Sequence, residues 1–444
     1  MSGRQKASVH FPLPLASNDR YLLVRGSVTL LRVSVVRSGF FIALFWFVFF
    51  GALGIFFPYY TLYLKENADL TGTELGMVLS VMPLVGILAQ PFWGNIADRT
   101  GARSRLIAFL AIGTALGFGV LGLAEGFMPI LCATALLAAF STPVIPLSVS
   151  VTLAVFRNSG PHAYGFARVW GTVGFLISVL IFPRGLTAFQ QWRELIPLPG
   201  GPSEPGLGVM FSATALLVLI AAFIAFALPT GGVVAARAPR GDWRRLFQNR
   251  PMKRLLLFSF GAYLFIQGPM GLLPVYVRSF GGTLETIQQM WILMLIVEIP
   301  LIMSSGMGLK RIGARGLLAA GVLAGGVRWT VCGLTSNLTW IYPVQMLHGV
   351  MVTGLMMGGP LYVDAIAPDR LRSTAQALVA VVGLGFGGIA SNTIAGWILQ
   401  HLGPSAPYLI GGAGALAMGL SIQGILPRVK REGESEGMGE GETR

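Results

Sequence analysis

Long apolar runs, separated by short polar segments, recur along the whole 444-residue chain. Each run is about 20 residues long, the length that an α-helix needs to cross the hydrocarbon core of a bilayer. Twelve such runs can be placed, and only short connections remain between them. The pattern therefore predicts an all-α integral membrane protein with twelve transmembrane helices, and it leaves no room for a soluble domain of ordinary size.

The predicted helices form two groups of six. The first group covers residues 40–64, 74–97, 104–124, 127–156, 164–183 and 208–228. The second group covers residues 254–278, 285–308, 315–335, 339–364, 373–400 and 405–427. The expected segments are a loose cytosolic arm (1–39), an N-terminal six-helix half (40–228), a cytosolic central loop (229–253), a C-terminal six-helix half (254–427) and a disordered Gly/Glu-rich tail (428–444).

Composition supports the membrane assignment, and the distribution of charge predicts an orientation. Hydrophobic residues make up 54% of the chain and charged residues only 11%. Of the 32 Lys and Arg residues, 27 fall on one side of the predicted membrane and four on the other. Because basic loops stay on the cytoplasmic side, both termini are expected in the cytoplasm. The net charge of +14 then reflects membrane topology, and no nucleic-acid partner is expected.

Two loops share a pattern at equivalent positions of the two groups. The pattern consists of Gly94, Arg99, Gly101 and Arg103 after the second helix, and of Gly306, Arg311, Gly313 and Arg315 after the eighth. The two sets are offset by 212 residues, close to half of the chain. A duplicated six-helix unit is the architecture of transporters whose halves rock around a midplane site.

These repeated loops are candidates for a conformational switch. Asp98 and the neighbouring basic residues are expected to pair with helix ends across the interface between the halves, and breaking and forming these pairs would bias the inward and outward states. The alternative for the basic residues is that they only follow the charge rule for cytoplasmic loops.

Further motifs accompany these loops. The first helix ends with Pro58-Tyr59, the second with Gln90-Pro91-Phe-Trp-Gly94, and the fifth opens with Tyr164-Gly165-Phe-Ala-Arg168-Val-Trp170-Gly171. The second half contains Arg328-Trp329, Gln345-Met-Leu-His348-Gly349 and Arg372-Ser-Thr-Ala-Gln376. Together they resemble the major facilitator superfamily, and within it the branch of lactose permease and the phenylpropionate permease-like proteins. The likeness covers about residues 40–425.

Three ionisable residues lie well inside predicted helices of the second half. They are Glu298, Arg328 and His348, on the eighth, ninth and tenth helices. A charge at the centre of a bilayer costs on the order of 2.5–3.5 kcal/mol, so such residues usually face a cavity and pair with one another. The three are therefore expected to form a proton-coupling cluster. A buried network that only fixes helix packing is the alternative.

The resemblance implies roles for single residues. Lactose permease-like symporters carry Glu, Arg and His on the matching helices as their proton-coupling cluster, with a second Glu three residues after the His. Here that position is Met351, which leaves Glu298 as the deep carboxylate. Arg168 matches the arginine that contacts substrate in that family, and Phe175 matches the aromatic residue that stacks on sugar. The sugar-binding carboxylate of the fourth helix has no counterpart in the stretch Pro146-Leu-Ser148-Val-Ser150.

Other polar residues of the predicted cavity-forming helices are candidates for substrate contact. For each of them a bridge between helices is the alternative. With Arg168 and Arg328, the expected substrate-binding set contains Tyr59, Gln267, Gln345 and Asn392.

These observations predict a secondary active transporter, in which a proton gradient drives symport of a small organic solute by alternating access. The missing carboxylate of the fourth helix, together with the arginines, favours an organic or aromatic acid. A proton-driven exporter, a uniporter, a multi-pass membrane enzyme and a non-transporting receptor are the alternatives. We expect no enzymatic activity, no metal site and no cofactor besides the proton gradient. The expected partners are the solute, protons and the lipid bilayer, with a monomer in the plasma (inner) membrane.

Overall fold

The computed structural model describes residues 18–156, 163–229, 246–368 and 371–428, with side chains from residue 37 onward apart from 163–164 and 305–310. All regular structure in these ranges is helical. Twelve spans within them are long and apolar enough to cross a membrane, which confirms the predicted fold class. They are Arg37–Glu66, Gly72–Thr100, Arg103–Gly122, Phe127–Phe156, Gly165–Trp192, Val209–Phe226, Arg250–Ser279, Leu284–Ser304, Arg311–Leu334, Leu338–Ile366, Arg372–Leu402 and Ala406–Ile425.

Six of the spans are each formed by a single helix, and two more are the halves of one long helix. The single helices are α3 (Gly72–Thr100), α4 (Arg103–Gly122), α7 (Ala163–Trp192), α8 (Val209–Phe226), α9 (Arg250–Ser279) and α15 (Ala406–Ile425). One further helix, α10 (Leu284–Leu334), runs through both the eighth and the ninth span and turns at Gly313.

The remaining spans are interrupted, mostly next to a proline. Proline lacks the backbone N–H that continues a helix, and its ring disturbs the preceding turn. The interrupted spans pair α1 (Asn18–Phe56) with α2 (Tyr60–Glu66), α5 (Phe127–Ser141) with α6 (Val144–Phe156), and α11 (Leu338–Val344) with α12 (Leu347–Ile366). In the eleventh span a π-helical segment, η3 (Val381–Gly387), separates α13 (Arg372–Ala380) from α14 (Gly388–Leu402).

Two segments differ from the prediction. The fifth predicted helix stops at residue 183, but α7 continues past Pro183 to Trp192. In membrane proteins neighbouring groups can satisfy the carbonyl that a proline leaves unbonded. Likewise α1 begins at Asn18, so a helix occupies residues 18–39 of the expected arm, and no proline in that stretch would stop it. Residues 1–17, 230–245 and 429–444, which include the rest of the arm and most of the central loop and tail, lie outside the described residues.

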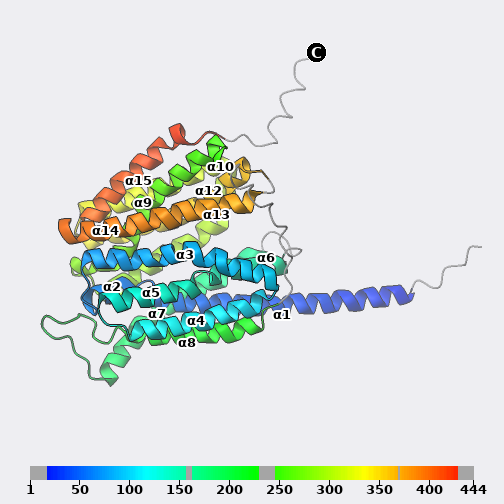
Figure 1. The fold of residues 1–444 in the computed structure, drawn as a ribbon, viewed down its shortest axis with the longest axis horizontal. Coiled ribbons are helices and arrows are strands. Elements are labelled where there is room, and N and C mark those ends of the chain that lie inside the picture. Colours follow the sequence, from blue (N-terminus) through cyan, green and yellow to red (C-terminus); the bar gives the residue numbers. More distant parts are fainter. Residues whose placement is uncertain (1–17, 157–162, 230–245, 369–370, 429–444) are drawn as a thin grey trace, which may run out of the picture.

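The helices form two groups that lie side by side, α1–α8 in the lower part of Figure 1 and α9–α15 in the upper part. Within the first group α1 packs on α7 and α4 on α8, and within the second group α10 packs on α12 and α15. We call the end of the molecule where α1 begins and α15 ends the terminal end, and the opposite end the distal end. The terminal end carries the repeated loops after α3 and within α10.

The repeated loops share a backbone feature. Gly101 and Gly313 stand at equivalent positions of the two halves and have φ angles of 66° and 69°. Glycine adopts positive φ angles without the steric penalty that other residues incur. The ψ angles differ, at −6° for Gly101 and 175° for Gly313, so the sequence repeat corresponds to a shared positive φ and not to the same turn.

The halves meet closely at the distal end, where α3 packs on α14. A Cβ atom added at Gly76 would lie 2.5 Å from the carbonyl oxygen of Asn392, and one at Gly396 would lie 2.5 Å from that of Gly72. Only glycine permits such close backbones. The Asn392 Nδ2 group also donates a hydrogen bond of 3.1 Å to the carbonyl of Leu79. This distal contact closes the molecule between α3 and α14.

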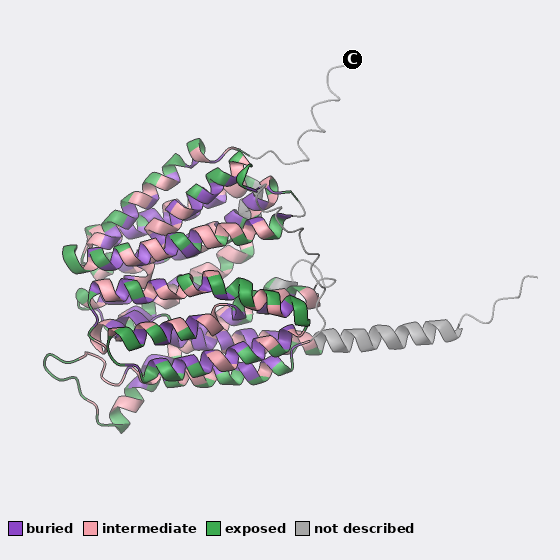
Figure 2. Ribbon diagram, in the orientation of Figure 1, coloured by how far each residue is buried: buried purple, intermediate pink, exposed green. Residues whose placement is uncertain are grey.

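Many large apolar side chains remain exposed on the helices. Exposed positions recur beside buried ones along the same helices (Figure 2). A water-soluble monomer rarely exposes so much contiguous apolar surface, whereas lipid tails accommodate it. Examples are Leu88, Leu123, Phe166, Phe223, Leu257, Met303 and Leu420. The exposed surface therefore suits a multi-pass membrane protein.

Replacement of Gly396 by valine should force the distal ends of the two halves apart. The new side chain would meet the backbones of Gly72 and Gly76, so α14 must move away from α3 by on the order of 2 Å. Double electron–electron resonance would show a longer distance between spin labels on cysteines introduced at Glu125 and Ser336, in a chain whose native cysteines are replaced by alanine.

The matched control is Gly119→Val on α4, where an added Cβ would meet no atom within 4 Å. The control should leave the distance distribution unchanged. An unchanged distribution in a folded Gly396→Val protein would contradict the proposed role of this contact.

Candidate functional site

Three charged or titratable side chains from successive spans lie together inside the second half. His348 on α12 stands between Arg328 and Glu298, which both belong to α10. Arg328 Nη1 is 3.0 Å from His348 Nδ1, and Glu298 Oε2 is 3.6 Å from His348 Nε2. The structure therefore brings together the three residues singled out in the sequence, in the order carboxylate, imidazole, guanidinium.

The arrangement determines which nitrogen of His348 carries a proton. An arginine side chain has only donors, so Nδ1 of His348 must accept the hydrogen bond from Arg328. The ring is then neutral, and its N–H is on Nε2. This N–H faces the carboxylate of Glu298.

Arg328 is completely buried, and its donors are satisfied within the protein. Gln345 Oε1 accepts hydrogen bonds from Nε at 2.9 Å and from Nη2 at 2.6 Å. The sulfur atoms of Met270 and Met294 lie 3.5 Å and 3.4 Å from the guanidinium nitrogens. The Trp329 ring centroid is 4.1 Å from Cζ. In this conformation Arg328 and Gln345 are thus engaged with each other.

Met351 occupies the position where the resemblance implies a second glutamate. It is buried and belongs to an apolar cluster with Ile266 and Val322. Glu298 therefore remains the carboxylate beside His348 among the described residues. Within the same residues, no three His, Cys, Asp or Glu side chains converge as a metal site.

Arg168 brings a positive charge from the first half to this cluster. Its guanidinium carbon on α7 lies 4.8 Å from the ring centroid of Trp46 and 4.0 Å from that of Phe50, both on α1. Cation–π contacts of this kind hold an arginine in place. Arg168 lies two turns before Phe175 on α7, and Glu298 lies two turns after Trp291 on α10, the helix that packs on α7. Because Phe175 contacts Trp291, Arg168 and Glu298 belong to the facing sides of these two helices.

An aromatic pair joins the halves next to the charged cluster. The ring centroids of Phe175 on α7 and Trp291 on α10 are 5.4 Å apart. Trp291 also lies beside His348, at a centroid distance of 6.4 Å. Sequence analysis did not single out Trp291, one of nine tryptophans. Its position two helical turns before Glu298, on the same face of the helix, was the available signal.

The other predicted substrate residues lie apart from this cluster, and in the described structure none of them is bonded to it. Tyr59 is buried against Phe182, with ring centroids 5.3 Å apart. Asn392 takes part in the contact between α3 and α14. Gln267 is half-buried on α9 beside Gly388.

The repeated loops are tied within each half in this conformation. Asp98 Oδ1 pairs with Arg103 Nη2 of the same loop at 2.8 Å, rather than with the opposite half as expected. Arg315 Nη1 donates to the carbonyl of Leu426 at the end of α15. The physical reason is that the close contacts between the halves lie at the distal end. Of the other loop residues, Arg99 and Arg311 are exposed, and the space around Gly94 is open.

An ion-pair cluster, not recognised in the sequence, connects the halves at the distal end. Arg278 at the end of α9 lies 3.2 Å from a carboxylate oxygen of Glu66 and 3.0 Å from one of Glu204. The Ser203 hydroxyl also donates to Glu66. All three charged side chains are largely buried. They are far apart in the sequence, so no local pattern could reveal them.

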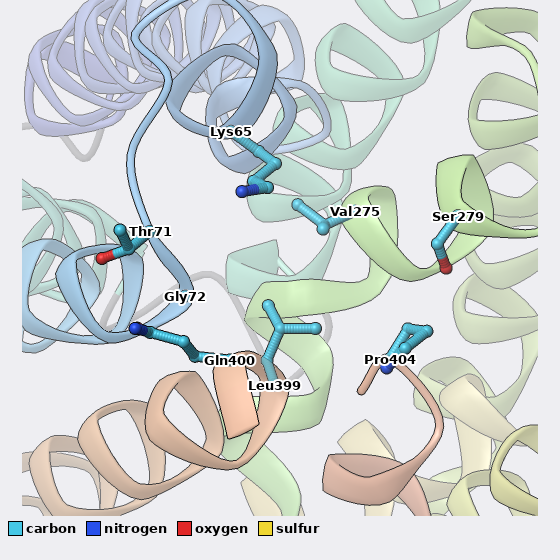
Figure 3. A pocket seen from close by; sticks show the side chains of 8 residues that line it. All are labelled: Lys65, Thr71, Gly72, Val275, Ser279, Leu399, Gln400 and Pro404. Carbon is cyan, nitrogen blue, oxygen red and sulfur yellow. The ribbon is translucent and has the colours of Figure 1, made fainter. Parts of the chain in front are cut away.

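A cavity of about 320 Å³ lies at the distal end between the two halves (Figure 3). Its lining comes from the first half through Lys65, Thr71 and Gly72, and from the second half through Val275, Ser279, Leu399, Gln400 and Pro404. Gln400 also accepts a hydrogen bond from the backbone of Thr73. The cavity therefore belongs to the distal contact rather than to the cluster around Glu298.

Known proteins with related sequences and structures are transporters. The maltose permease of Geobacillus stearothermophilus is 32% identical over 372 residues, covering 82% of this chain and 89% of the relative. A probable 3-phenylpropionic acid transporter of Escherichia coli is 28% identical over 378 residues, covering 83% and 93%. The solved structure of the nucleoside transporter NupG aligns with a TM-score of 0.71 at 16% identity, covering 87% of this chain and 98% of that one.

The family assignment agrees with the fold. The MFS_1-like family matches residues 40–410, a stretch that reaches from the first span into the last. The matched proteins are transporters of this superfamily rather than enzymes. The chain therefore belongs to the MFS_1-like family, and it is a multi-pass membrane transporter of the major facilitator superfamily.

Proposed function

We propose that this transporter carries a small organic solute together with a proton, by alternating access of one site to the two sides of the membrane. The observation that carries the proposal is the largely buried carboxylate of Glu298, which lies 3.6 Å from neutral His348 in its own half and on the face of α10 that is turned to Arg168 and Phe175 of the other half. No cofactor besides the proton gradient takes part.

The position of Glu298 suggests how a proton acts on the halves. A proton that binds Glu298 cancels its negative charge, and with it the attraction to Arg168 and to the N–H of His348. The attraction between opposite charges is strong where water is excluded. Because Arg168 belongs to the other half, protonation of one carboxylate changes the free energy of holding the halves together.

The solute favoured by this site is an organic acid with a ring. Arg168 offers a guanidinium that can form charge-assisted hydrogen bonds with a carboxylate, and Phe175 and Trp291 offer aromatic faces beside it. Arg328 contributes a fixed charge, since Gln345 and His348 already engage it. The likeness to a probable 3-phenylpropionic acid transporter supports this choice.

A disaccharide is the second candidate solute, because the maltose permease is similar over most of the chain. One observation weighs against it. Ser148, in the stretch of the fourth span where the sugar-binding carboxylate is missing, is buried and donates to the carbonyl of Val144. Uptake of radiolabelled maltose and 3-phenylpropionate into proteoliposomes separates the two candidates.

The orientation follows from the distribution of basic residues. The terminal end is assigned to the cytoplasm, in the plasma (inner) membrane. The contacts between the halves then close the outer side, through α3 with α14 and through Arg278 with Glu66 and Glu204. One chain supplies both halves of the site, so the monomer is the transporting unit.

Replacement of Glu298 by glutamine should uncouple solute movement from proton movement. The amide keeps the shape of the side chain but does not take up a proton in the same range of pH. In proteoliposomes with a pH-sensitive dye inside, solute-dependent proton uptake should fall to the level of vesicles without protein, while exchange of solute for solute continues.

The control for this test is Glu285→Gln, the same change at an exposed position near the start of α10. It should leave proton uptake intact. If Glu298→Gln still moves protons with the solute, the coupling role of Glu298 is wrong.

Replacement of Arg278 by glutamine should favour states that are open at the distal end. Removing one partner of a largely buried ion pair costs on the order of 3 kcal/mol, which corresponds to a shift on the order of a hundred-fold in the conformational equilibrium. Spin labels at Glu125 and Ser336 should show a larger population at long distance.

The control is Arg193→Gln, which removes an exposed arginine directly after α7 at the distal end. It should cause no such shift. Equal effects of the two changes would contradict a specific role for Arg278.

A further inference from the structure

One face of α7 and one face of α10 form a ladder of contacts between the halves. From the distal end inward, Gln288 contacts Val179 and Trp291 packs on Phe175. Glu298 and Arg168 follow two turns further along the same faces of α10 and α7. The residue numbers rise along α10 as they fall along α7, which is the order expected of antiparallel helices. The spacing of three to seven residues keeps each set on one helical face.

The distal step of the ladder depends on Pro183. Proline has no N–H, so it cannot bond the carbonyl oxygen of Val179 four residues earlier. Gln288 Nε2 from the other half donates to that oxygen at 2.8 Å and to the carbonyl of Leu180 at 2.9 Å. The polar groups of this step are therefore satisfied by the protein itself.

The middle step is different, because the indole N–H of Trp291 is buried and has no hydrogen-bond partner among the described residues. A buried donor without a partner destabilises a protein, so such donors are rare and call for an explanation. Two other tryptophans of the same fold are satisfied: Trp46 donates to Thr152 and Trp93 to the carbonyl of Ala139, each at 3.0 Å.

The surroundings of Trp291 also set it apart from Trp329, whose N–H lacks a partner too. Trp329 is completely buried within the second half, between Arg328 and Tyr408. Trp291 instead faces the other half, beside His348 and two turns from Glu298. Only the Trp291 donor is thus placed where both halves and the proton site meet.

We propose that Trp291 contacts the transported solute and contributes to specificity. Its indole N–H donates a hydrogen bond to an oxygen of the solute, and its ring lies against the ring of the solute together with Phe175. The inference rests on the proposed transport function. A ring and oxygen acceptors within one small molecule are the chemistry common to an aromatic acid and a sugar, and the assay below distinguishes the two.

The test is Trp291→Phe in proteoliposomes, with whichever of 3-phenylpropionate and maltose the wild type accumulates as the probe. KM should rise about five- to ten-fold, the effect of losing one hydrogen bond, while Vmax stays within about two-fold because the proton site is intact. The control is Trp397→Phe, since Trp397 is half-exposed on α14 and stacks on His401.

A second variant separates the hydrogen bond from packing. Benzothienylalanine at position 291 keeps the double ring and replaces only the N–H by sulfur, so it should reproduce the higher KM even if phenylalanine impairs folding. A wild-type KM in the benzothienylalanine protein would overturn the inference and leave the transport function standing. If the wild type accumulates neither solute, the proposed function and the inference fall together.

Discussion

The buried charge of Arg328 is the constraint on which the centre of the second half depends. A guanidinium inside an apolar span is tolerated only if its donors are satisfied. Gln345 accepts two of its hydrogen bonds and His348 a third. The third bond determines the tautomer of His348, and the tautomer directs an N–H toward Glu298. The ionisation state of the Glu298 carboxylate is thus linked, through the ring of His348, to the completely buried charge of Arg328.

The contacts between the halves have a different physical character. They consist of close backbones at Gly76 and Gly396, a carbonyl left free by Pro183, and ion pairs around Arg278. Each of these polar or backbone contacts is small, and such contacts can open and close again at moderate cost. Apolar side chains of both halves also meet, because Phe175 and Leu295 belong to the same buried cluster.

The proposed proton site and the contacts between the halves share a pair of helices. Glu298, Trp291 and Gln288 lie on one face of α10, and Phe175 and Val179, which contact Trp291 and Gln288, lie on one face of α7. A change in the charge of Glu298 therefore takes place beside the contacts that hold the halves together. It can affect these contacts directly, without a chain of intervening residues. Met351 is buried in an apolar cluster one turn after His348, so Glu298 is the carboxylate beside this histidine among the described residues.

The sequence by itself determined the number of spans, because the length of each apolar run must match the thickness of the bilayer. It also revealed the repeated loops, because Gly101 and Gly313 both stand where the backbone has a positive φ angle. It also singled out Glu298, Arg328 and His348, because a charge within an apolar run is visible locally. Only the tertiary structure decided which of these groups touch. The end of α7, the neighbours of Trp291 and the partners of Arg278 depend on residues far apart in the chain, and no periodicity or local propensity records such contacts.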